Sequence, residues 1–432
     1  MKNYFNNKVK VPIDKAISLL NNLIEIPSIK GKKNDDLIDF LQGELEELDC
    51  HPKIFTADSD KFLDYPEYCP FSEGKEKKQK YITGIIKGSG GGKSILIFSH
   101  LDTEGVENRD LWDTDPLKLV KKDDRLYGLG SNDAKSGVAA CLMALRIIKE
   151  MGIKLRGDVR FIGENEKDMG ATGPLAVFTK DWGVDAALYV HSSETGRGVG
   201  EVKTATFGVL TFMITVFGEK PPLREQGNPQ NYVCIKDGIN AIDKAIKIIE
   251  ALNEYAKKRD QEFNNKNTEK TTFNIGVIKG GEAPGVVADK CVVEGNIVFS
   301  AYTHETLDSI FGEIEKVLQK AIEENASLKK CPPKLEKIGL RGNPGSLAVL
   351  GKGDEILQAL KESVEAEDGC DFSIYDHHQV SVLRFPMIYA KLPTIAFGPK
   401  GDNFYKPNEW VSQEEYVKSI RILINTIIKW CK

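Results

Sequence analysis

A histidine and an aspartate two residues apart are the first residues in this sequence whose types could do chemistry. His100 and Asp102 directly follow the apolar run Ile-Leu-Ile-Phe at residues 95–98. A neutral imidazole is a good zinc ligand, and a carboxylate two residues on can hold its second nitrogen in the required tautomer. We therefore predict that His100 binds a metal ion and that Asp102 assists at the catalytic centre. By itself, the His100–Asp102 pair is weak support for a metal site, because most His-x-Asp pairs are not metal sites.

A second candidate ligand lies in the glycine-rich segment 127–137, Tyr-Gly-Leu-Gly-Ser-Asn-Asp-Ala-Lys-Ser-Gly. This segment places Asp133 just before an apolar helix that we predict over residues 138–150. A carboxylate in that position can bridge two metal ions with its two oxygens. The alternative is that Asp133 only caps the helix.

Two further groups of acidic and imidazole side chains follow predicted strands. Residues 164–168, Glu-Asn-Glu-Lys-Asp, follow a strand over 157–162 and offer a general base and another ligand. His191 and Glu194 follow the buried strand 184–190, and either can bind zinc. A solvated charged loop is the alternative for the first group, and a structural histidine is the alternative for the second.

These side chains need elements that bring them together, and the hydrophobic pattern predicts a mostly parallel sheet for that task. The apolar runs are short, and glycine-rich or polar segments bound them, which is typical of buried strands. Open α/β sheets bind ligands at the carboxyl ends of such strands. Helical periodicity predicts helices over residues 13–24, 34–49, 138–150, 354–366 and 413–430.

From residue 204 the pattern changes to strand, helix, strand, strand and helix. The segments concerned are residues 207–217, 236–257, 273–278, 290–299 and 304–325. This order is typical of a separate α+β layer. We predict a discontinuous catalytic domain over residues 1–203 and 328–432, with an inserted domain over residues 204–327.

Composition narrows the class of protein. The 432 residues exceed what one hydrophobic core usually serves, so two domains are expected. The net charge of −5 comes without a long basic run, so nucleic acid and anionic membranes have no support as partners. No apolar stretch is long enough to span a membrane, and no signal-peptide core is seen. The eight cysteines form no Cys-x-x-Cys pair, so we expect a cytoplasmic protein with free thiols.

The His100-x-Asp102 pair, Asp133 in its glycine-rich turn and the acidic positions downstream together resemble the co-catalytic zinc amidohydrolases and peptidases. This is the family of acetylornithine deacetylase, succinyl-diaminopimelate desuccinylase and aminoacylase-1. The resemblance implies an α/β, zinc-peptidase-like catalytic domain with a mixed, mostly parallel sheet, and an inserted α+β lid of the dimerisation type. It further implies one or two zinc or other divalent ions, and a homodimer formed through the lid. The implied reaction is cleavage of an amide bond in an N-acyl amino acid or small peptide by metal-bound hydroxide.

The resemblance also implies roles for individual residues. Asp102 would act at the catalytic centre, with Glu164 or Glu166 as the general base, and Arg384 would pair with a substrate carboxylate. The implied metal ligands are His100, Asp133, Asp168, and His191 or Glu194.

Departures from the family pattern affect the base and the second metal. An ungapped comparison puts Lys167 where the family has its base, and Tyr405 stands where the family has a zinc-binding histidine. His377 or His378 could supply the missing nitrogen. Loss of a general base removes about 10²–10⁴-fold of rate. The alternative function is therefore a catalytically impaired relative that acts as a binding or assembly protein, with one metal or none.

Overall fold

The structure is a computed structural model, and it describes residues 9–68, 78–106, 109–165, 171–221, 238–263, 271–376 and 378–432. The chain divides into two compact units. The first unit contains residues 1–206 and 345–432, and the second contains residues 207–344. The second unit is thus inserted into the first along the chain.

One predicted boundary differs from the structure. We expected the chain to return to the first domain at residue 328, but residues 328–344 belong to the second unit. The reason is strand β12 (Lys334–Gly342), which pairs antiparallel with β9 (Gly208–Phe217) and completes the sheet of the second unit.

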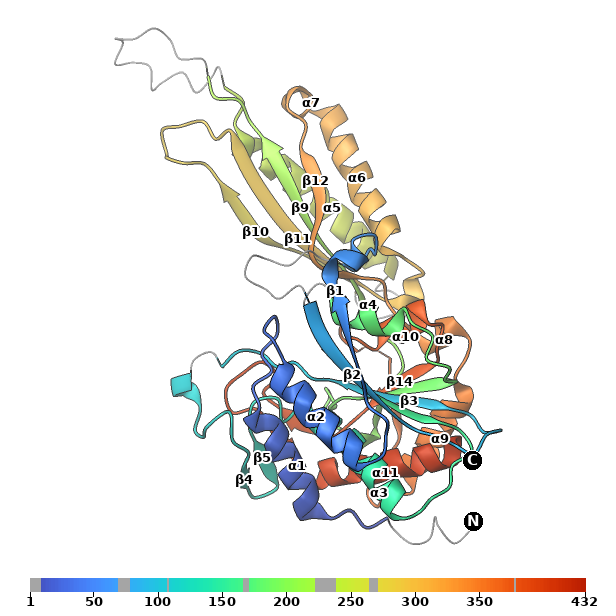
Figure 1. The fold of residues 1–432 in the computed structure, drawn as a ribbon. Coiled ribbons are helices and arrows are strands. Elements are labelled where there is room, and N and C mark those ends of the chain that lie inside the picture. The colour runs from blue at the N-terminus through green and yellow to red at the C-terminus, as the bar shows by residue number, and fades with distance from the viewer. Residues whose placement is uncertain are drawn as a thin grey trace. The chain divides into compact units, whose positions relative to one another are not determined.

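The first unit is built on an eight-stranded sheet in the order β1-β2-β6-β3-β7-β14-β8-β13 (Figure 1). Its central strands β6, β3, β7 and β14 are parallel neighbours, whereas β1, β2 and β6 pair antiparallel. The sheet is therefore mixed and mostly parallel, as predicted. The strands are β1 (Lys53–Asp58), β2 (Lys78–Ile86), β3 (Ile95–His100), β6 (Val159–Glu164), β7 (Ala186–Val190), β8 (Glu201–Lys203), β13 (Ser373–Tyr375) and β14 (Thr394–Phe397).

Helices cover both faces of this sheet, which explains why β3 is an unbroken apolar run. Ile95 and Ile97 belong to a core cluster with α1, α2, α3, α9 and α11, whereas Leu96 and Phe98 belong to a cluster with α4 and α10. A strand buried on both faces has no polar side to alternate. The helices are α1 (Ile13–Glu25), α2 (Asp35–Glu47), α3 (Lys135–Glu150), α4 (Thr172–Phe178), α8 (Leu347–Leu350), α9 (Asp354–Glu365), α10 (Arg384–Tyr389) and α11 (Gln413–Trp430).

A small second sheet in the first unit has the order β15-β16-β5-β4. Its strands are β4 (Val120–Lys122), β5 (Arg125–Tyr127), β15 (Gly401–Asp402) and β16 (Trp410–Ser412). The pairing of β5 with β16 holds the glycine-rich turn after Tyr127 beside the segment 401–412. Short 3₁₀ turns complete the described elements: Ser59–Phe62, Arg109–Leu111, Gly198–Gly200 and, in the second unit, Ala301–Thr303.

The second unit is a four-stranded antiparallel sheet, β10-β11-β9-β12, with helices α5 and α6 packed on it (Figure 1). Residues of β11 alternate between buried and half-buried, as expected for a strand with one covered face. The remaining elements are β10 (Thr272–Gly280), β11 (Lys290–Phe299), α5 (Ala241–Phe263), α6 (Leu307–Glu324) and α7 (Ala326–Lys330).

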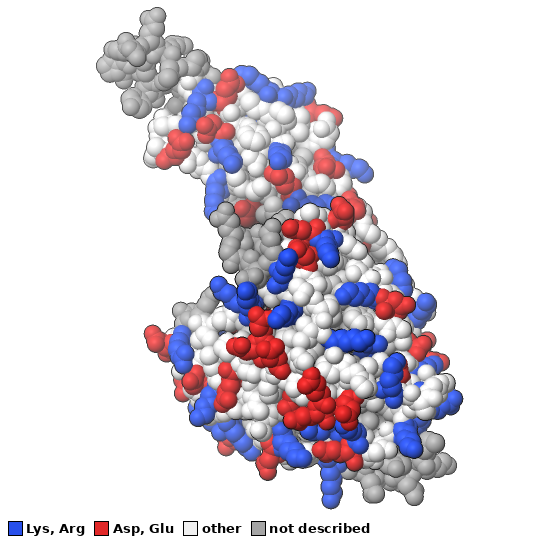
Figure 2. Space-filling model, viewed as in Figure 1, with Lys and Arg blue, Asp and Glu red and all other residues white. Residues whose placement is uncertain are grey.

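The mixed surface charges agree with the modest net charge of the sequence. On the face shown in Figure 2, basic and acidic side chains are interspersed over both units. Among the helices that the structure describes, none combines the length and the apolar character needed to cross a membrane.

Candidate metal centre and active site

Three predicted metal ligands converge in the first unit. His100 ends β3, His191 follows β7, and Asp133 lies in the turn between β5 and α3. The Nε2 atoms of His100 and His191 lie 2.9 Å and 3.1 Å from the same oxygen, Asp133 Oδ1. The three ligand atoms lie within 4.8 Å of one another, and all three residues are buried. The parallel pairing of β3 with β7 accounts for this arrangement, because it aligns the carboxyl ends of both strands.

The hydrogen bonds of the two imidazoles favour a cation at this point. His100 Nδ1 lies 3.0 Å from the backbone oxygen of Asp102, and His191 Nδ1 lies 3.1 Å from that of Ser192. A carbonyl oxygen only accepts, so these contacts favour the tautomer with the proton on Nδ1 and a lone pair on Nε2, while the donor Lys203 Nζ also lies 3.3 Å from His191 Nδ1. Two nitrogen lone pairs and a carboxylate oxygen then face one another, which is unfavourable unless a cation lies among them. Two imidazoles and a carboxylate form a donor set typical of zinc.

The charge state of His191 also suits a metal ligand. Burial, together with the nearby charge of Lys203, lowers the pKa of His191 to about 3. The imidazole is therefore neutral at pH 7, as a metal ligand must be.

The turn that carries Asp133 is held by a buried glutamate. Glu409 precedes β16 and accepts hydrogen bonds from the backbone N–H groups of Gly130, Asn132 and Asp133, each at 2.8 Å. Burial and the charge of Asp133 raise the pKa of Glu409, and the three N–H donors act in the opposite sense. Lys135, also buried, donates to the backbone oxygens of Leu23 and Ile26, which ties the start of α3 to α1. The Asp133 carboxylate thus has a rigid support.

The segment that carries His191 has an equivalent support from β8. Glu201 accepts from the backbone N–H groups of Glu194 and Thr195 at 2.8 Å. Lys203 is fully buried, and its Nζ donates to the Ser192 carbonyl oxygen at 2.5 Å while lying 3.3 Å from His191 Nδ1. Burial lowers the pKa of Lys203, and the charges of Glu194 and Glu201 act in the opposite sense. One glutamate and one lysine therefore shape each of the two ligand-bearing turns.

Glu194 does not join the group formed by His100, Asp133 and His191. Its Oε1 lies 2.6 Å from Nδ1 of His378, a buried residue of the segment after β13. Burial alone would raise the pKa of Glu194, but His378 lowers it to about 2. Of the two alternatives offered by the sequence, His191 lies in this group, and Glu194 pairs with an imidazole. Tyr405, at the position of the family histidine, is 58% exposed.

The two described candidates for proton transfer and orientation lie beside His100. Asp102 is buried, and its Oδ1 lies 3.6 Å from His100 Nδ1. Glu164 ends β6, is fully buried, and pairs in register with His100 across the parallel strands. Glu166, Lys167 and Asp168 lie outside the described residues, as does His377.

Arg384, predicted to bind a substrate carboxylate, begins helix α10 and is 2% exposed. Its Nη1 donates to the backbone oxygen of Ser381 at 2.8 Å, and its guanidinium lies over the ring of Phe385. The structure therefore does not bring Arg384 into the group around Asp133.

A cavity of 290 Å³ lies beside the metal centre, and we call it the side cavity. His191 belongs to its wall, and so do the Glu194–His378 pair and three further aromatic rings. The described residues that line it are Tyr189, His191, Glu194, His378, Gln379, Val380, Ser381, Val382, Phe404 and Tyr405.

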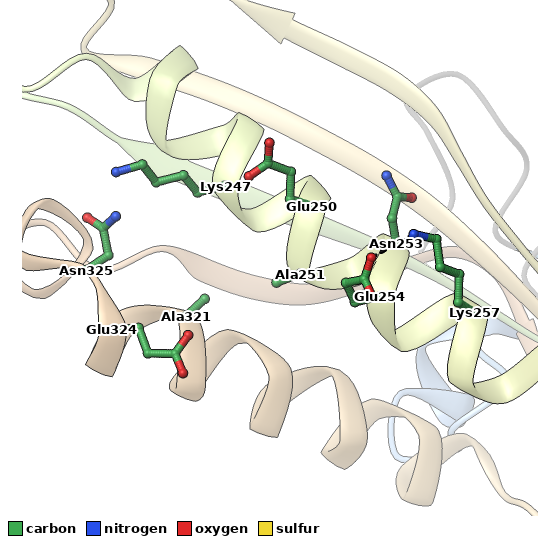
Figure 3. Close-up of a pocket in the computed structure, with 9 residues that line it drawn as sticks. All are labelled: Lys247, Glu250, Ala251, Asn253, Glu254, Lys257, Ala321, Glu324 and Asn325. Atoms are coloured by element: carbon green, nitrogen blue, oxygen red, sulfur yellow. Dashed lines mark hydrogen bonds and ion pairs between the residues drawn. The ribbon is translucent and has the colours of Figure 1, made fainter.

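A larger hollow of 580 Å³ lies in the second unit between α5 and α6 (Figure 3). Its described lining contains no histidine or cysteine, and it consists mainly of charged and polar side chains at the helix surfaces. These residues are Lys247, Glu250, Ala251, Asn253, Glu254, Lys257, Ala321, Glu324 and Asn325. Nothing in it matches the chemistry of the group around Asp133.

Four residues of the site were not assigned a definite role by the sequence: Glu201, Lys203, His378 and Glu409. A local pattern could have indicated Glu201 and Lys203, because two oppositely charged side chains that are two residues apart on a strand point to the same side of the sheet. For Glu409 and His378 no local pattern was available, because Glu409 contacts a backbone 276 residues away and His378 a side chain in another segment.

Comparison with known proteins agrees with this geometry. Over 450 aligned residues the chain is 27% identical to N-formyl-4-amino-5-aminomethyl-2-methylpyrimidine deformylase of Bacillus subtilis (strain 168), covering 98% of this chain and 96% of that protein. It is 27% identical over 279 residues to acetylornithine deacetylase of Myxococcus xanthus, covering 63% of each. The crystal structure of aminopeptidase PepT from Bacillus cereus ATCC 10987 matches with a TM-score of 0.71 at 18% identity, covering 98% of this chain and 100% of that chain, which shows a shared fold.

The family match covers most of the chain. Residues 96–429, well over half of the sequence, match the family described as Peptidase family M20/M25/M40. This range contains all of the predicted site residues and the whole inserted unit. The chain therefore belongs to peptidase family M20/M25/M40 and is a metal-dependent hydrolase of amide bonds.

Proposed function

We propose that this chain removes a small acyl group, with formyl as the first candidate, from the amine of a small molecule. The observation that carries the proposal is the convergence of the buried residues His100, Asp133 and His191 on one point. The choice of substrate is supported by the deformylase relative, which aligns with nearly the whole chain. The alternative of a catalytically impaired binding protein has no support among these relatives.

The proposed mechanism assigns roles to this chain's own residues. His100, Asp133 and His191 would hold a divalent ion, with zinc as the first candidate. Such an ion, when bound, polarises a carbonyl oxygen and lowers the pKa of water. Asp102 would keep the His100 imidazole in the ligand tautomer, and Glu164 would serve as the general base. Glu166 and Asp168 remain proposed as the alternative base and as a ligand of a second ion.

Three further expectations belong to the same proposal. The second unit would act as a lid, and it would pair with its counterpart in a homodimer. The exposed edge strand β10, which carries the 52% exposed Ile278, offers such a contact. A cytoplasmic location is supported by the six described cysteines, which are all free thiols.

The test is a metal count followed by a substrate panel. The purified chain should contain one or two equivalents of divalent metal by mass spectrometry. It should hydrolyse an N-formyl amine in preference to N-acetylornithine and to dipeptides. A chelator should abolish turnover, and added zinc should restore it. A protein that contains metal yet cleaves none of these amides would overturn the proposed function.

A further inference from the structure

The side cavity adjoins the group formed by His100, Asp133 and His191. His191 is shared between the metal group and the cavity wall. A substrate whose amide reaches the metal centre therefore has this cavity beside the amide. Its volume of 290 Å³ is at the lower end for small-molecule sites. It has room for one ring with substituents.

Three aromatic residues, Tyr189, Phe404 and Tyr405, form part of the wall of the side cavity together with the imidazoles of His191 and His378. The ring of Phe404 lies nearly parallel to that of His191, at 17° with centroids 6.1 Å apart. Tyr189 packs against the same imidazole at 5.1 Å, and Tyr405 lies 6.4 Å from Phe404. Tyr405 has a φ of +59° and is 58% exposed, so the backbone holds a large ring at the surface. Such walls favour a flat aromatic ligand.

Two polar groups of the side cavity can act as hydrogen-bond acceptors, the Glu194 carboxylate and the His378 imidazole. Glu194 contributes a carboxylate, and His378 Nδ1 faces that carboxylate at 2.6 Å. With its proton on Nδ1, the His378 ring presents an acceptor at Nε2. This Nε2 is buried and has no hydrogen-bond partner among the described residues, although His378 is only 2% exposed. A buried polar atom of this kind needs a partner, and a ligand amino group would provide one.

Cationic groups are absent from the described wall of the side cavity. Lys203 is fully buried behind it and donates to the Ser192 carbonyl oxygen, and Arg384 donates to the Ser381 carbonyl oxygen. A substrate carboxylate would therefore meet the Glu194 carboxylate without a compensating cation from these residues. Like charges so placed disfavour binding.

We propose that the side cavity binds the amine half of the substrate and selects a flat ring that carries amino groups over a carboxylate-bearing amine. This inference rests on the proposed function and names the substrate class that it left open. Phe404 and Tyr405 supply the stacking surface, and Glu194 and His378 supply the acceptors. A carboxylate is therefore disfavoured in the side cavity, whereas it would be favoured if Arg384 bound a substrate carboxylate.

A matched pair of amines tests the charge preference. 4-Aminobenzylamine and 4-(aminomethyl)benzoate share the ring and the aminomethyl group and differ in one substituent. Their N-formyl derivatives are offered to the metal-loaded enzyme, and the free amines are titrated into chelator-treated protein by calorimetry. We expect kcat/KM and affinity to be at least tenfold higher for the amino-substituted compound. Equal values, or a preference for the carboxylate, would overturn the inference even without any variant.

Two variants test the named residues. Phe404→Leu should weaken binding of 4-aminobenzylamine by about three- to tenfold, the size of one aromatic contact. Phe217→Leu, a change at a 41% exposed ring in the second unit, is the matched control and should have no effect. Glu194→Gln should reduce the preference between the two amines by about tenfold or more, because a charge-assisted acceptor is lost.

The proposed reaction and the assignment of the side cavity can fail independently of each other. If neither N-formyl compound is cleaved while calorimetry still shows the amine preference, the proposed reaction is wrong and the cavity assignment stands. If both are cleaved with the same kcat/KM and Phe404→Leu changes nothing, the reaction stands and the cavity assignment is wrong. Unchanged thermal melting of each variant shows that the comparison is between folded proteins.

Discussion

The Nε2 atoms of His100 and His191 converge on Asp133 Oδ1. This arrangement depends on backbone carbonyl groups that take the Nδ1 protons of His100 and His191. It depends equally on Glu409, whose carboxylate gathers three N–H groups of the Asp133 turn. At the residue scale, the supporting groups therefore determine metal affinity along with the ligands.

Replacement of Glu409 tests this support. In Glu409→Gln, the side-chain amide turns one oxygen into an N–H donor that faces backbone N–H groups, so the turn loses its geometry. We expect zinc affinity to fall by about 10–100-fold, measured by competition with a chromogenic chelator. Glu414→Gln, a change at an exposed residue of α11, is the control and should bind zinc like the wild type. Wild-type affinity in Glu409→Gln would show that Asp133 needs no such support.

At the scale of elements, helix α3 has to approach the sheet closely to place Asp133 near the strand ends. Gly137 in its first turn makes that possible, because a Cβ there would lie 2.1 Å from the backbone oxygen of Val190 at the end of β7. Ser99 of β3 bridges the same contact through the backbone oxygens of Val190 and Ala134. The distance between α3 and β7 thus depends on one missing methyl group.

The same substitution in two helices separates this effect from helix propensity. Gly137→Ala should lower the free energy of unfolding by about 1–3 kcal/mol through overpacking and should weaken zinc binding. Gly43→Ala in α2, where a Cβ meets nothing within 4 Å, should raise the free energy of unfolding by about 0.5–1 kcal/mol. Urea unfolding measures both changes. A stabilised Gly137→Ala protein would mean that α3 can move away from β7 at no cost.

An ion pair at the start of β6 predicts a pH dependence of stability. Asp158 lies 2.7 Å from Lys87 Nζ and accepts from the Gly88 N–H. Burial acts to raise the pKa of Asp158, but these partners lower it below the ordinary value. A lowered folded-state pKa means that Asp158 stabilises the fold above its unfolded value, and that this contribution is lost as the pH falls through the folded value.

Asp158→Asn should therefore cost up to about 1 kcal/mol at pH 7, and the difference from wild type should shrink as the pH falls below about 4. Urea unfolding at pH 7 and at lower pH measures this difference in the free energy of unfolding between the variant and the wild type. Asp115→Asn, which removes an exposed ion pair with Arg109, is the control and should change little at either pH. A difference that grows on acidification would contradict the assignment.

At the scale of the whole molecule, the chain contains two units with separate cores, and the described metal group lies within the first. The second unit has its own buried ion pair. Arg259 is 4% exposed and pairs through both terminal nitrogens with Glu305 on the segment before α6. The stability of the second unit and metal binding should therefore respond to different substitutions.

Arg259→Met tests this separation. It leaves Glu305 buried without its partner, so we expect a loss of about 3–5 kcal/mol in the stability of the second unit. Calorimetric unfolding should show this loss while the metal content stays at the wild-type value. Removal of metal should have the converse effect and lower the unfolding temperature of the first unit. Loss of metal in Arg259→Met would show that the two units do not act separately.

Much of this organisation was predictable because short stretches of the sequence encode it. Unbroken apolar runs identified β3 and β7, and the polar residues at their ends identified His100 and His191. The glycine-rich segment before an apolar helix identified Asp133, and the change of pattern at residue 204 identified the inserted unit. The boundary at residue 328 differs from the structure, because β12 is mostly exposed or half-buried, and its place in the second unit comes from pairing with β9.

What the sequence determined by itself is the identity of the strand ends and the residue types gathered there, since periodicity and turn residues act over a few neighbours. The tertiary structure alone decided which of them meet. Glu194 pairs with His378 and not with the metal group, and Glu409 supports a turn 276 residues away. Such contacts depend on how strands and turns are placed in the folded sheet, and no spacing along the chain encodes that distance.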